Sequence, residues 1–202
     1  MTRTLIVSDL EGVFAPEIWP IIGHKLGLPE LSATTRDIPD FEQLMDARIT
    51  ALKRHNVKFS DIRSVVSEIR LFNGAETLLS TFSELPNTRC IIITDSFYEF
   101  IDLTLKKKFG WEIFANRFKI RDDVIDSCVF EIGGHKGHVL KTAMEPAETI
   151  IAIGDSFNDV EMLKLARFKV LFNPITELKG MFKDSIICKN FDELTSVISR
   201  LT

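Results

Sequence analysis

The chain contains short, uninterrupted runs of apolar residues that are each followed at once by polar residues. Three of these runs are Leu5-Ile6-Val7, Cys90 to Ile93 and Thr149 to Ile153. A run without polar alternation is typical of a strand that is buried on both faces, as in a parallel sheet. Because the carboxyl ends of parallel strands meet at one edge, we expect the polar groups that follow these runs to converge there.

Strand-like runs alternate with helical periodicity after about residue 72, which predicts parallel strands joined by right-handed crossovers. Residues 16 to 70 break this alternation and predict consecutive helices. A proline in the first turn, an apolar stripe and a Ser-Asp capping signal predict helices at Pro16 to Leu26, Asp40 to His55 and Ser60 to Arg70. We therefore predict an α/β fold with a parallel sheet flanked by helices. Residues 1–14 and 71–202 form its catalytic core, and residues 15–70 form a small helical cap inserted over the strand ends.

Composition narrows the class of protein without naming an activity. With 202 residues, of which 45% are hydrophobic, the chain can bury the core of one domain and an inserted subdomain. A formal net charge of −4 gives no basic surface for nucleic acid or for an acidic membrane. No window approaches the roughly 20 apolar residues of a membrane span, and the first apolar run is too short for a signal peptide. The odd cysteine count (Cys90, Cys128 and Cys188), without a Cys-x-x-Cys pair, fits a reducing, cytoplasmic setting.

Chemically useful side chains follow each of the three buried runs. They lie in Asp9-Leu10-Glu11-Gly12, in Thr94-Asp95-Ser96 and in the segment from Gly154 to Asp159, with Lys136-Gly137 between the last two. Taken singly, Asp9 could be a turn residue and Asp155 could cap a helix. Capping does not explain why all three segments follow buried strands, so together they indicate phosphoryl transfer through an aspartate.

These segments, in this order, resemble the haloacid dehalogenase superfamily. Three longer strings resemble its bifunctional phosphoserine phosphatase/homoserine phosphotransferase branch: Asp9 to Val13 with Pro16-Glu17-Ile18-Trp19, Ala33 to Asp40, and Phe97-Tyr98-Glu99-Phe100. The fold that the resemblance implies is a Rossmann-like core with a parallel sheet flanked by helices and a small inserted helical cap. It further implies phosphoserine as substrate, homoserine as a second phosphoryl acceptor, and a homodimer.

The resemblance also assigns roles at the core site. Asp9 becomes the nucleophile and Glu11 the general acid, while Thr94 and Lys136 hold phosphate oxygens. An anionic nucleophile and a phosphate dianion need a divalent cation between them, and Mg²⁺ suits an all-oxygen site. Its predicted ligands are the carboxylates of Asp9 and Asp155 and the backbone carbonyl of Glu11, with Asp159 in or near the coordination sphere. Asn158 would order the phosphate loop. The competing interpretation of Lys136 is a solvated lysine like Lys141.

The predicted cap carries an arginine on its apolar stripe. Phe41, Leu44 and Met45 lie on one face of the second helix, and Arg48 falls on the same face. Arg48 either extends to water or meets an anion, and the resemblance makes that anion the substrate carboxylate, with Phe41 beside it. Glu17 is correspondingly expected to meet the substrate ammonium; its structural alternative is a glutamate that favours the dipole of the first turn.

The second motif departs from most phosphoserine phosphatases, which carry Ser-Gly-Gly there. Asp95 and Ser96 replace the two glycines and are predicted to contact substrate, and the bifunctional branch also has an acid at that place. Two alternatives to a phosphoserine phosphatase follow from the sequence. One is a phosphatase for another small ester, such as a sugar phosphate or nucleotide. The other is a non-catalytic binding module with the same fold.

Overall fold

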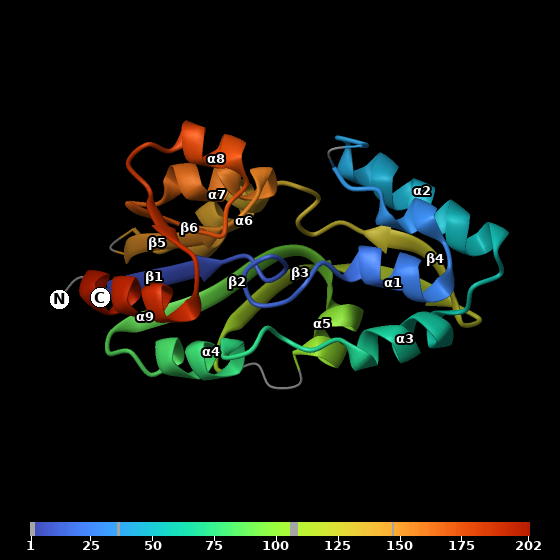
Figure 1. Ribbon diagram of the computed structural model, residues 1–202, viewed down its shortest axis with the longest axis horizontal. Helices are drawn as coiled ribbons and strands as arrows, with labels where there is room; N and C mark the ends of the chain where they lie inside the picture. Colours follow the sequence, from blue (N-terminus) through green and yellow to red (C-terminus); the bar gives the residue numbers. More distant parts are fainter. Residues whose placement is uncertain (1–2, 36, 106–108, 147) are drawn as a thin grey trace.

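The computed structural model describes residues 3–35, 37–105, 109–146 and 148–202, so Arg36 of the string from Ala33 to Asp40 lies outside the described residues. An α/β core occupies one end of the molecule and helices α1 to α3 the other (Figure 1). The strands are β1 (Arg3–Ser8), β2 (Thr88–Phe97), β3 (Glu112–Arg121), β4 (Val124–Val129), β5 (Glu148–Gly154), β6 (Phe168–Phe172) and β7 (Ile186–Cys188). The α-helices are α1 (Ile18–Leu26), α2 (Phe41–Arg54), α3 (Phe59–Glu68), α4 (Ala75–Ser83), α5 (Tyr98–Thr104), α6 (Lys136–Ala143), α7 (Val160–Leu165), α8 (Thr176–Met181) and α9 (Phe191–Leu201), with 3₁₀ turns η1 (Pro29–Ser32) and η2 (Phe157–Asp159). Within these ranges, no helix combines the length and apolarity needed to cross a membrane.

The three apolar runs form the centre of the sheet. Its strand order is β4-β3-β2-β1-β5-β6-β7, and β1 pairs in parallel with both β2 and β5. Ile6 lies opposite Cys90 on one side and Ile151 on the other. The predicted buried parallel strands are therefore neighbours, and their carboxyl ends meet at one edge.

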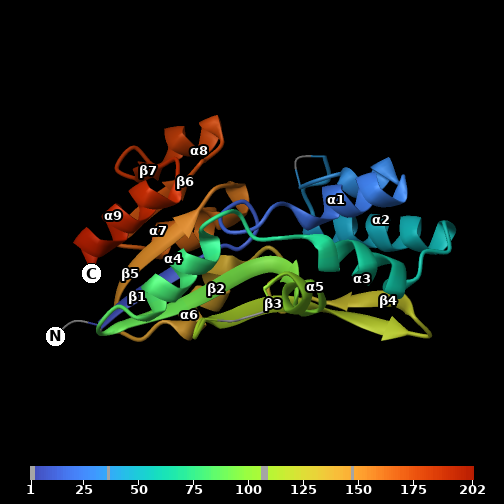
Figure 2. The same ribbon diagram turned by 60° about the horizontal axis from the view of Figure 1, so that its bottom comes forward.

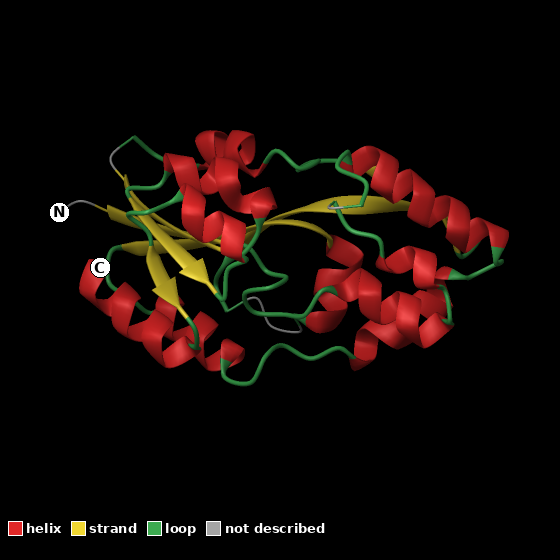
Figure 3. Cartoon of the chain, turned by 45° about the horizontal axis from the view of Figure 1, so that its top comes forward, coloured by secondary structure: helices red, strands yellow, loops and turns green. Residues whose placement is uncertain are grey.

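Helices cover both faces of this sheet, which is why its central strands carry no polar alternation. Helices α4 and α9 pack on one face, whereas α6, α7 and α8 pack on the other (Figure 3). Successive residues of β1 alternate between these two layers: Ile6 belongs to the first cluster, and Leu5 and Val7 belong to the second. All three are fully buried.

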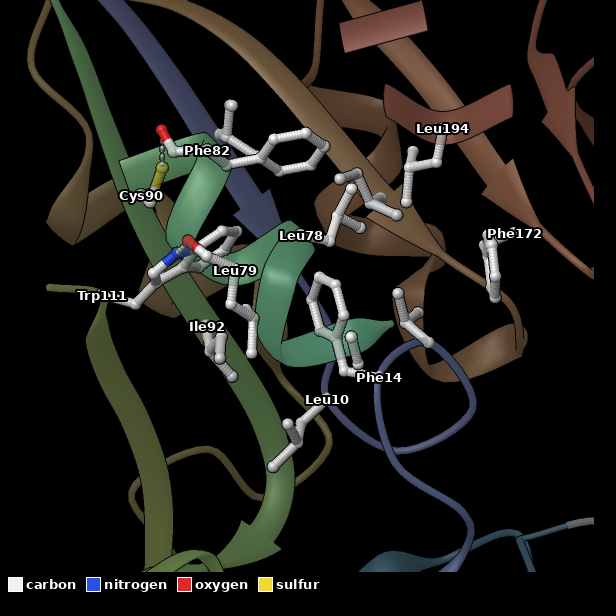
Figure 4. Packing of buried hydrophobic residues seen from close by; sticks show 14 of the residues in the cluster. Leu10, Phe14, Leu78, Leu79, Phe82, Cys90, Ile92, Trp111, Phe172 and Leu194 are labelled. Carbon is white, nitrogen blue, oxygen red and sulfur yellow. Dashed lines mark hydrogen bonds between the residues drawn. The ribbon is translucent and has the colours of Figure 1, made fainter. Parts of the chain in front are cut away.

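The segment after β1 is anchored by its own apolar residues. Leu10 and Phe14 are fully buried among Leu78, Leu79 and Trp111 (Figure 4). The Phe14 ring meets the Trp111 ring edge-on at 5.9 Å, and the Trp111 indole donates to the carbonyl of Leu79 at 2.8 Å. Burying an aromatic or leucine side chain contributes about 1.5–3 kcal/mol. The loop between Leu10 and Phe14, which carries Glu11 and Gly12, is therefore held in one conformation.

The strands after residue 72 are not all parallel, and in this respect the crossover prediction is wrong. β4 runs antiparallel to β3, and Asp122 and Asp123 turn the chain with φ of 49° and 61°. Aspartate tolerates this left-handed conformation, which two-residue hairpin turns require. The hairpin extends from the core sheet alongside helices α1 to α3 (Figure 2).

The three predicted cap helices are present, and they pack on this hairpin. Asp40, the first residue of the predicted second helix, is its N-cap and accepts the backbone N–H of Gln43 at 2.9 Å. One hydrophobic cluster contains residues of the cap helices together with Phe97, Phe100 and Phe118. At the hairpin turn, the carboxylate of Asp123 accepts the N–H and hydroxyl of Ser60 at 3.0 and 2.6 Å. Hairpin and helices thus share one hydrophobic core.

Candidate active site

A pocket of about 350 Å³ lies between the carboxyl ends of the central strands and the cap. The core and the cap both contribute to it. The sequence-predicted residues that line it are Asp9, Glu11, Glu17, Phe41, Arg48, Thr94, Asp95, Ser96, Lys136 and Asn158. Asp155 and Asp159 adjoin it, since their carboxylate oxygens and one of Asp9 all lie within 4.8 Å of one another. The structure therefore brings together all twelve residues that the motifs singled out.

Lys136 is the positive centre of the core side of the pocket. Its Nζ lies 2.6 Å from Oδ2 of Asp9 and 2.8 Å from Oδ1 of Asp159, and only 1% of its side chain is exposed. Burial by itself would lower the pKa of Lys136, but the carboxylates of Asp159 and Asp9 raise it well above the ordinary value. Lys141, the competing lysine, is exposed in the last turn of α6. The lysine that neutralises the carboxylates is therefore Lys136.

Asp9 is held at the end of β1 in a fixed orientation. Its backbone N–H donates to the carbonyl of Ile153 at 3.1 Å, and its Oδ1 accepts the N–H of Leu10 at 2.7 Å. Burial raises the pKa of Asp9 well above its ordinary value, and Lys136 opposes that shift. This environment favours a further positive charge beside the carboxylate.

Asp155 offers an oxygen that such a cation could use. Its Oδ1 is buried and has no hydrogen-bond partner among the described residues. Burial and the neighbouring Asp159 raise the pKa of Asp155 to about 7. An unpaired buried carboxylate oxygen is costly unless something binds it. Carboxylate oxygens spaced within 4.8 Å can close on one Mg²⁺, whose ligands lie at about 2.0–2.1 Å, so the residues fit that ion.

The oxygens of Asp159 are already occupied. Oδ1 accepts from Lys136, while Oδ2 accepts the backbone N–H groups of Asp155 at 2.9 Å and Ser156 at 3.2 Å. Asp159 therefore fixes both the lysine and the loop that carries Asp155. Asp9 is likewise engaged by Lys136 and Leu10, so among the three carboxylates only Asp155 keeps a buried oxygen without a hydrogen-bond partner in the described part of the chain.

Gly12 makes the approach of Asp155 to the first loop sterically feasible. Gly12 has φ of +84°, and a Cβ at this position would lie 2.5 Å from Oδ2 of Asp155. We expect Gly12→Ala to displace that carboxylate and to raise the Mg²⁺ concentration for half-maximal activity at least about tenfold, since angstrom-scale misplacement of a reacting group costs up to about 10². The measurement is a Mg²⁺ titration of phosphate release.

Gly27→Ala is the matched control for Gly12→Ala. Gly27 has φ of +67°, but a Cβ at this position would have no atom of the described residues within 4 Å. Both substitutions incur the backbone strain of a positive φ, roughly 1 kcal/mol, and only that at Gly12 meets Asp155. Equal Mg²⁺ dependence in the two variants would contradict the assignment of Asp155.

Glu11 is placed to transfer a proton. Its Oε2 accepts the backbone N–H of Ile18 at 3.0 Å, the first residue of α1. Burial, reinforced by the charge of Glu17, raises the pKa of Glu11 to about 7. A carboxyl group that titrates near neutrality can both give and accept a proton at that pH, which general acid–base catalysis requires.

The second motif lies inside a strand rather than after one. β2 continues to Phe97, with an irregularity in its pairing to β3 between Ile93 and Phe97. The buried side chain of Asn116 on β3 supports that irregular segment. Its Nδ2 donates to the carbonyl of Asp95 at 2.9 Å, and its Oδ1 accepts the N–H of Ile132 at 2.9 Å. Sequence reasoning missed Asn116; an asparagine inside an apolar strand, where it is disfavoured, was the available signal.

The cap side of the pocket presents one arginine and one glutamate. Arg48 is 6% exposed, its Nη2 donates to the carbonyl of Ala33 at 2.7 Å, and its guanidinium lies 4.7 Å from the Trp19 ring centroid. Nε has no hydrogen-bond partner among the described residues. Burial lowers the pKa of Arg48 to about 10, partly offset by Glu11 and Glu17. Arg48 thus remains charged at neutral pH and faces the pocket.

Glu17 and Phe41 lie at the starts of cap helices. Helix α1 begins at Ile18, so Glu17 precedes it as the N-cap residue and not in its first turn, as the proline signal had predicted. Its side chain makes no capping hydrogen bond and lines the pocket. Phe41 packs edge-on against Phe130 at 5.6 Å. The interpretation of Glu17 as a first-turn residue that favours the helix dipole is therefore wrong.

A cap-to-core contact closes one side of the pocket. The hydroxyl of Thr35 donates to Oδ1 of Asn158 at 3.5 Å, across 123 positions of sequence. Thr35 and Phe157 also line the pocket, and sequence reasoning did not single them out. Nothing in the local pattern around Thr35 indicates that it meets the loop of Asn158.

Comparison with known proteins identifies the family. A family model described as haloacid dehalogenase-like hydrolase matches residues 19–167. The chain belongs to this family. A phosphoserine phosphatase of Pseudomonas syringae pv. tomato is 34% identical over 188 residues, which are 92% of this chain and 78% of that protein. The phosphoserine phosphatase ThrH of Pseudomonas aeruginosa is 32% identical over 82% of this chain and 80% of its own length.

Solved structures of phosphoserine phosphatases share the fold. A substrate-bound phosphoserine phosphatase complex superposes with a TM-score of 0.81 at 21% identity, covering 98% of this chain and 99% of that one. A phospho-aspartyl intermediate analogue of phosphoserine phosphatase superposes with a TM-score of 0.79 at 22% identity over the same shares. The α/β fold, and the family predicted from the four motifs, are confirmed.

Proposed function

We propose that this chain is a Mg²⁺-dependent phosphoserine phosphatase that works through a phosphoaspartyl intermediate on Asp9. The proposal rests on one observation: the charged side chains on the two sides of a single pocket suit the two ends of phosphoserine. The core side holds the carboxylate of Asp9 beside the buried Lys136, and the cap side holds the buried Arg48 together with Glu17. One side suits a phosphate ester, and the other suits an α-carboxylate with an α-ammonium group. The names of the two relatives that share about a third of its residues support the same substrate.

In the first half-reaction Asp9 is the nucleophile. A carboxylate oxygen of Asp9 bonds to phosphorus as the bond from phosphorus to the serine oxygen breaks, and Glu11 donates its proton to that oxygen. Lys136 and the hydroxyl of Thr94 bind non-bridging phosphoryl oxygens and stabilise the charge that they carry in the transition state. Glu11 suits this step because its pKa of about 7 leaves it largely protonated below neutral pH.

In the second half-reaction Glu11 acts as a base. It removes the proton from an acceptor hydroxyl as the acceptor oxygen attacks phosphorus, and the carboxylate of Asp9 leaves. Water as acceptor gives inorganic phosphate, and homoserine gives phosphohomoserine. Asp9, Asp155 and the carbonyl of Glu11 would hold Mg²⁺, which when bound neutralises charge between the carboxylate and the phosphoryl group. Asp159 keeps Lys136 and the Asp155 loop in position throughout.

A substrate screen tests the proposal. Phosphate release with Mg²⁺ is measured for phosphoserine, phosphothreonine, a sugar phosphate and a nucleotide, and is repeated with homoserine and product analysis. We expect phosphoserine to have the highest kcat/KM. A higher kcat/KM for a sugar phosphate or nucleotide would establish the alternative ester. No release from any substrate would support a non-catalytic module.

The length of residue 11 should affect the choice of acceptor. Glutamate is one methylene longer than the aspartate found at this position in most of the family. In Glu11→Asp the shorter side chain moves the carboxylate away from the acceptor oxygen. A water molecule can move to the new position of the carboxylate, but a homoserine bound by Arg48 and Glu17 cannot. We expect the ratio of phosphohomoserine to inorganic phosphate to fall about tenfold, because angstrom-scale displacement is costly for a positioned acceptor. The ratio is measured at saturating homoserine.

Glu177→Asp, the same chemical change at an exposed position of α8, serves as the control for this comparison. An unchanged product ratio in Glu11→Asp would assign acceptor choice to the cap pocket instead. The homodimer expected from the resemblance stays a prediction, which sedimentation of the purified protein checks.

A further inference from the structure

Four buried side-chain polar atoms have no hydrogen-bond partner among the described residues, and all belong to this site. They are Nε of Arg48, Oδ2 of Asp95, Oγ of Ser96 and Oδ1 of Asp155. The proposed function uses Arg48 for a carboxylate and Asp155 for a cation. It gives no task to Oδ2 of Asp95, which lines the same pocket on the side of Lys136.

The Asp95 side chain is fixed in one orientation. Oδ1 accepts the backbone N–H of Gly134 at 2.9 Å, and the backbone carbonyl of Asp95 accepts Nδ2 of Asn116 at 2.9 Å. These two bonds leave Oδ2 directed toward Lys136, with its Nζ 3.9 Å away, beyond hydrogen-bond distance. Only 11% of the side chain is exposed. Apart from this long ion pair with Lys136, Oδ2 has no hydrogen-bond partner among the described residues and is held in place to make one.

The charges nearby favour a neutral carboxyl at this position. The single positive charge of Lys136 already lies beside the carboxylates of Asp9 and Asp159, so it does not neutralise a third carboxylate at Asp95 as well. An ionised Asp95 would add a third negative charge beside the place where a phosphate dianion must bind. A protonated carboxyl avoids that repulsion and converts the unpaired oxygen into a hydrogen-bond donor.

We propose that Oδ2 of Asp95 is a phosphate-binding hydrogen-bond donor that contacts a non-bridging phosphoryl oxygen of the substrate. The proposal rests on the phosphatase function above and adds to it a neutral acid in the phosphate site. Burial raises the pKa of Asp95, which supports this state. The groups that face it are Lys136 and the N–H of Gly134, which oppose the shift, then Asp159, which reinforces it, and His135, which opposes it.

Binding of inorganic phosphate tests this contact without relying on the identity of the ester. Calorimetric titration with phosphate in saturating Mg²⁺ compares the wild type, Asp95→Asn and Asp95→Ala. Asparagine keeps the acceptor for Gly134 and places an N–H donor at the Oδ2 position. We expect Asp95→Asn to bind phosphate within about threefold of the wild type at pH 6. Asp95→Ala should bind about tenfold to hundredfold more weakly, as for loss of a hydrogen bond to a charged group.

The pH dependence separates the neutral from the ionised acid. The ratio of the wild-type Kd to that of Asp95→Asn cancels the titration of the ligand and of the other groups. It should start near one and rise with pH as the wild-type carboxyl ionises. Asp192→Asn, at an exposed position of α9, is the control and should track the wild type throughout.

Three outcomes would overturn the proposal. At pH 6, Asp95→Asn could bind phosphate at least tenfold more tightly than the wild type, which means that Asp95 is an anion there. The ratio could lie well above one at every pH, which would show an ionised Asp95 throughout. Alternatively, both variants could bind phosphate like the wild type while the KM for phosphoserine changes. Asp95 would then contact the serine portion of the substrate and not its phosphate. The phosphate-binding results do not depend on whether phosphoserine is the preferred ester. The substrate screen tests that part of the proposed function separately.

Discussion

Asp9→Asn is expected to abolish phosphate release from phosphoserine. The asparagine keeps the shape of the side chain, and its amide cannot form the bond to phosphorus that the mechanism requires. Removing the nucleophile of a covalent mechanism reduces kcat by roughly 10⁴-fold or more. The measurement is the initial rate of phosphate release in saturating Mg²⁺, with brief exposure to ³²P-labelled phosphoserine followed by acid quench to detect label on the protein.

The matched control for this prediction is Asp192→Asn, which makes the same change at an exposed position of α9. It should retain full activity and acid-stable labelling. Asp9→Asn should show neither. Because Asp9 lies 2.6 Å from Lys136, the variant also needs a thermal unfolding curve to show that it is folded. Activity within tenfold of the wild type in a folded Asp9→Asn would show that another group attacks phosphorus.

Arg48→Ala is expected to remove selectivity for the amino acid part of the substrate. Truncating one partner of a buried, hydrogen-bonded charge pair costs about 2–5 kcal/mol, which is roughly 30-fold or more in kcat/KM for phosphoserine. p-Nitrophenyl phosphate has no carboxylate, so its kcat/KM should change by less than about threefold. The ratio of the two kcat/KM values is the measurement, because it cancels general losses of active enzyme.

Arg54→Ala tests whether the loss is specific to the pocket. Arg54 lies on the same helix, but its guanidinium pairs with Glu30 at the surface, 2.6 Å away. It should leave the selectivity ratio unchanged. Arg48→Lys should recover only part of the loss, since an ammonium lacks the planar fork that binds a carboxylate with two hydrogen bonds. A ratio in Arg48→Ala equal to that of the wild type would remove Arg48 from substrate recognition.

The elements that could be predicted from the sequence are those with a strong local signal. The run Leu5-Ile6-Val7 predicted a buried strand because a strand covered by helices on both faces needs apolar residues at every position. The apolar stripe predicted the second helix over Asp40 to His55, and α2 spans Phe41–Arg54, because residues three and four apart in sequence share one helix face. The hairpin at Asp122 and Asp123 was missed, because its partner is the cap, far away in sequence.

The residues of the candidate site likewise include some that local motifs predicted and some that only the fold revealed. The motifs predicted that Asp9, Glu11 and Asp155 would meet, since each follows or adjoins the end of a central strand. They did not reveal Asn116, which joins the Asp95 carbonyl to the backbone of Ile132 and thereby links two segments of the pocket. The asparagine is unusual for a strand, but its sequence position does not say which distant backbone groups it joins.

The sequence by itself determined the three buried central strands, the helices between residues 16 and 70, and the set of carboxylates at one sheet edge. These depend on periodicity and on contacts between near neighbours, which local patterns record. Only the tertiary structure decided that Lys136 and not Lys141 is buried, that the oxygens of Asp159 are occupied, and that one oxygen of Asp95 and one of Asp155 have no hydrogen bond among the described residues. Whether a buried oxygen has a partner depends on atoms brought together from distant segments, and no local pattern encodes that arrangement.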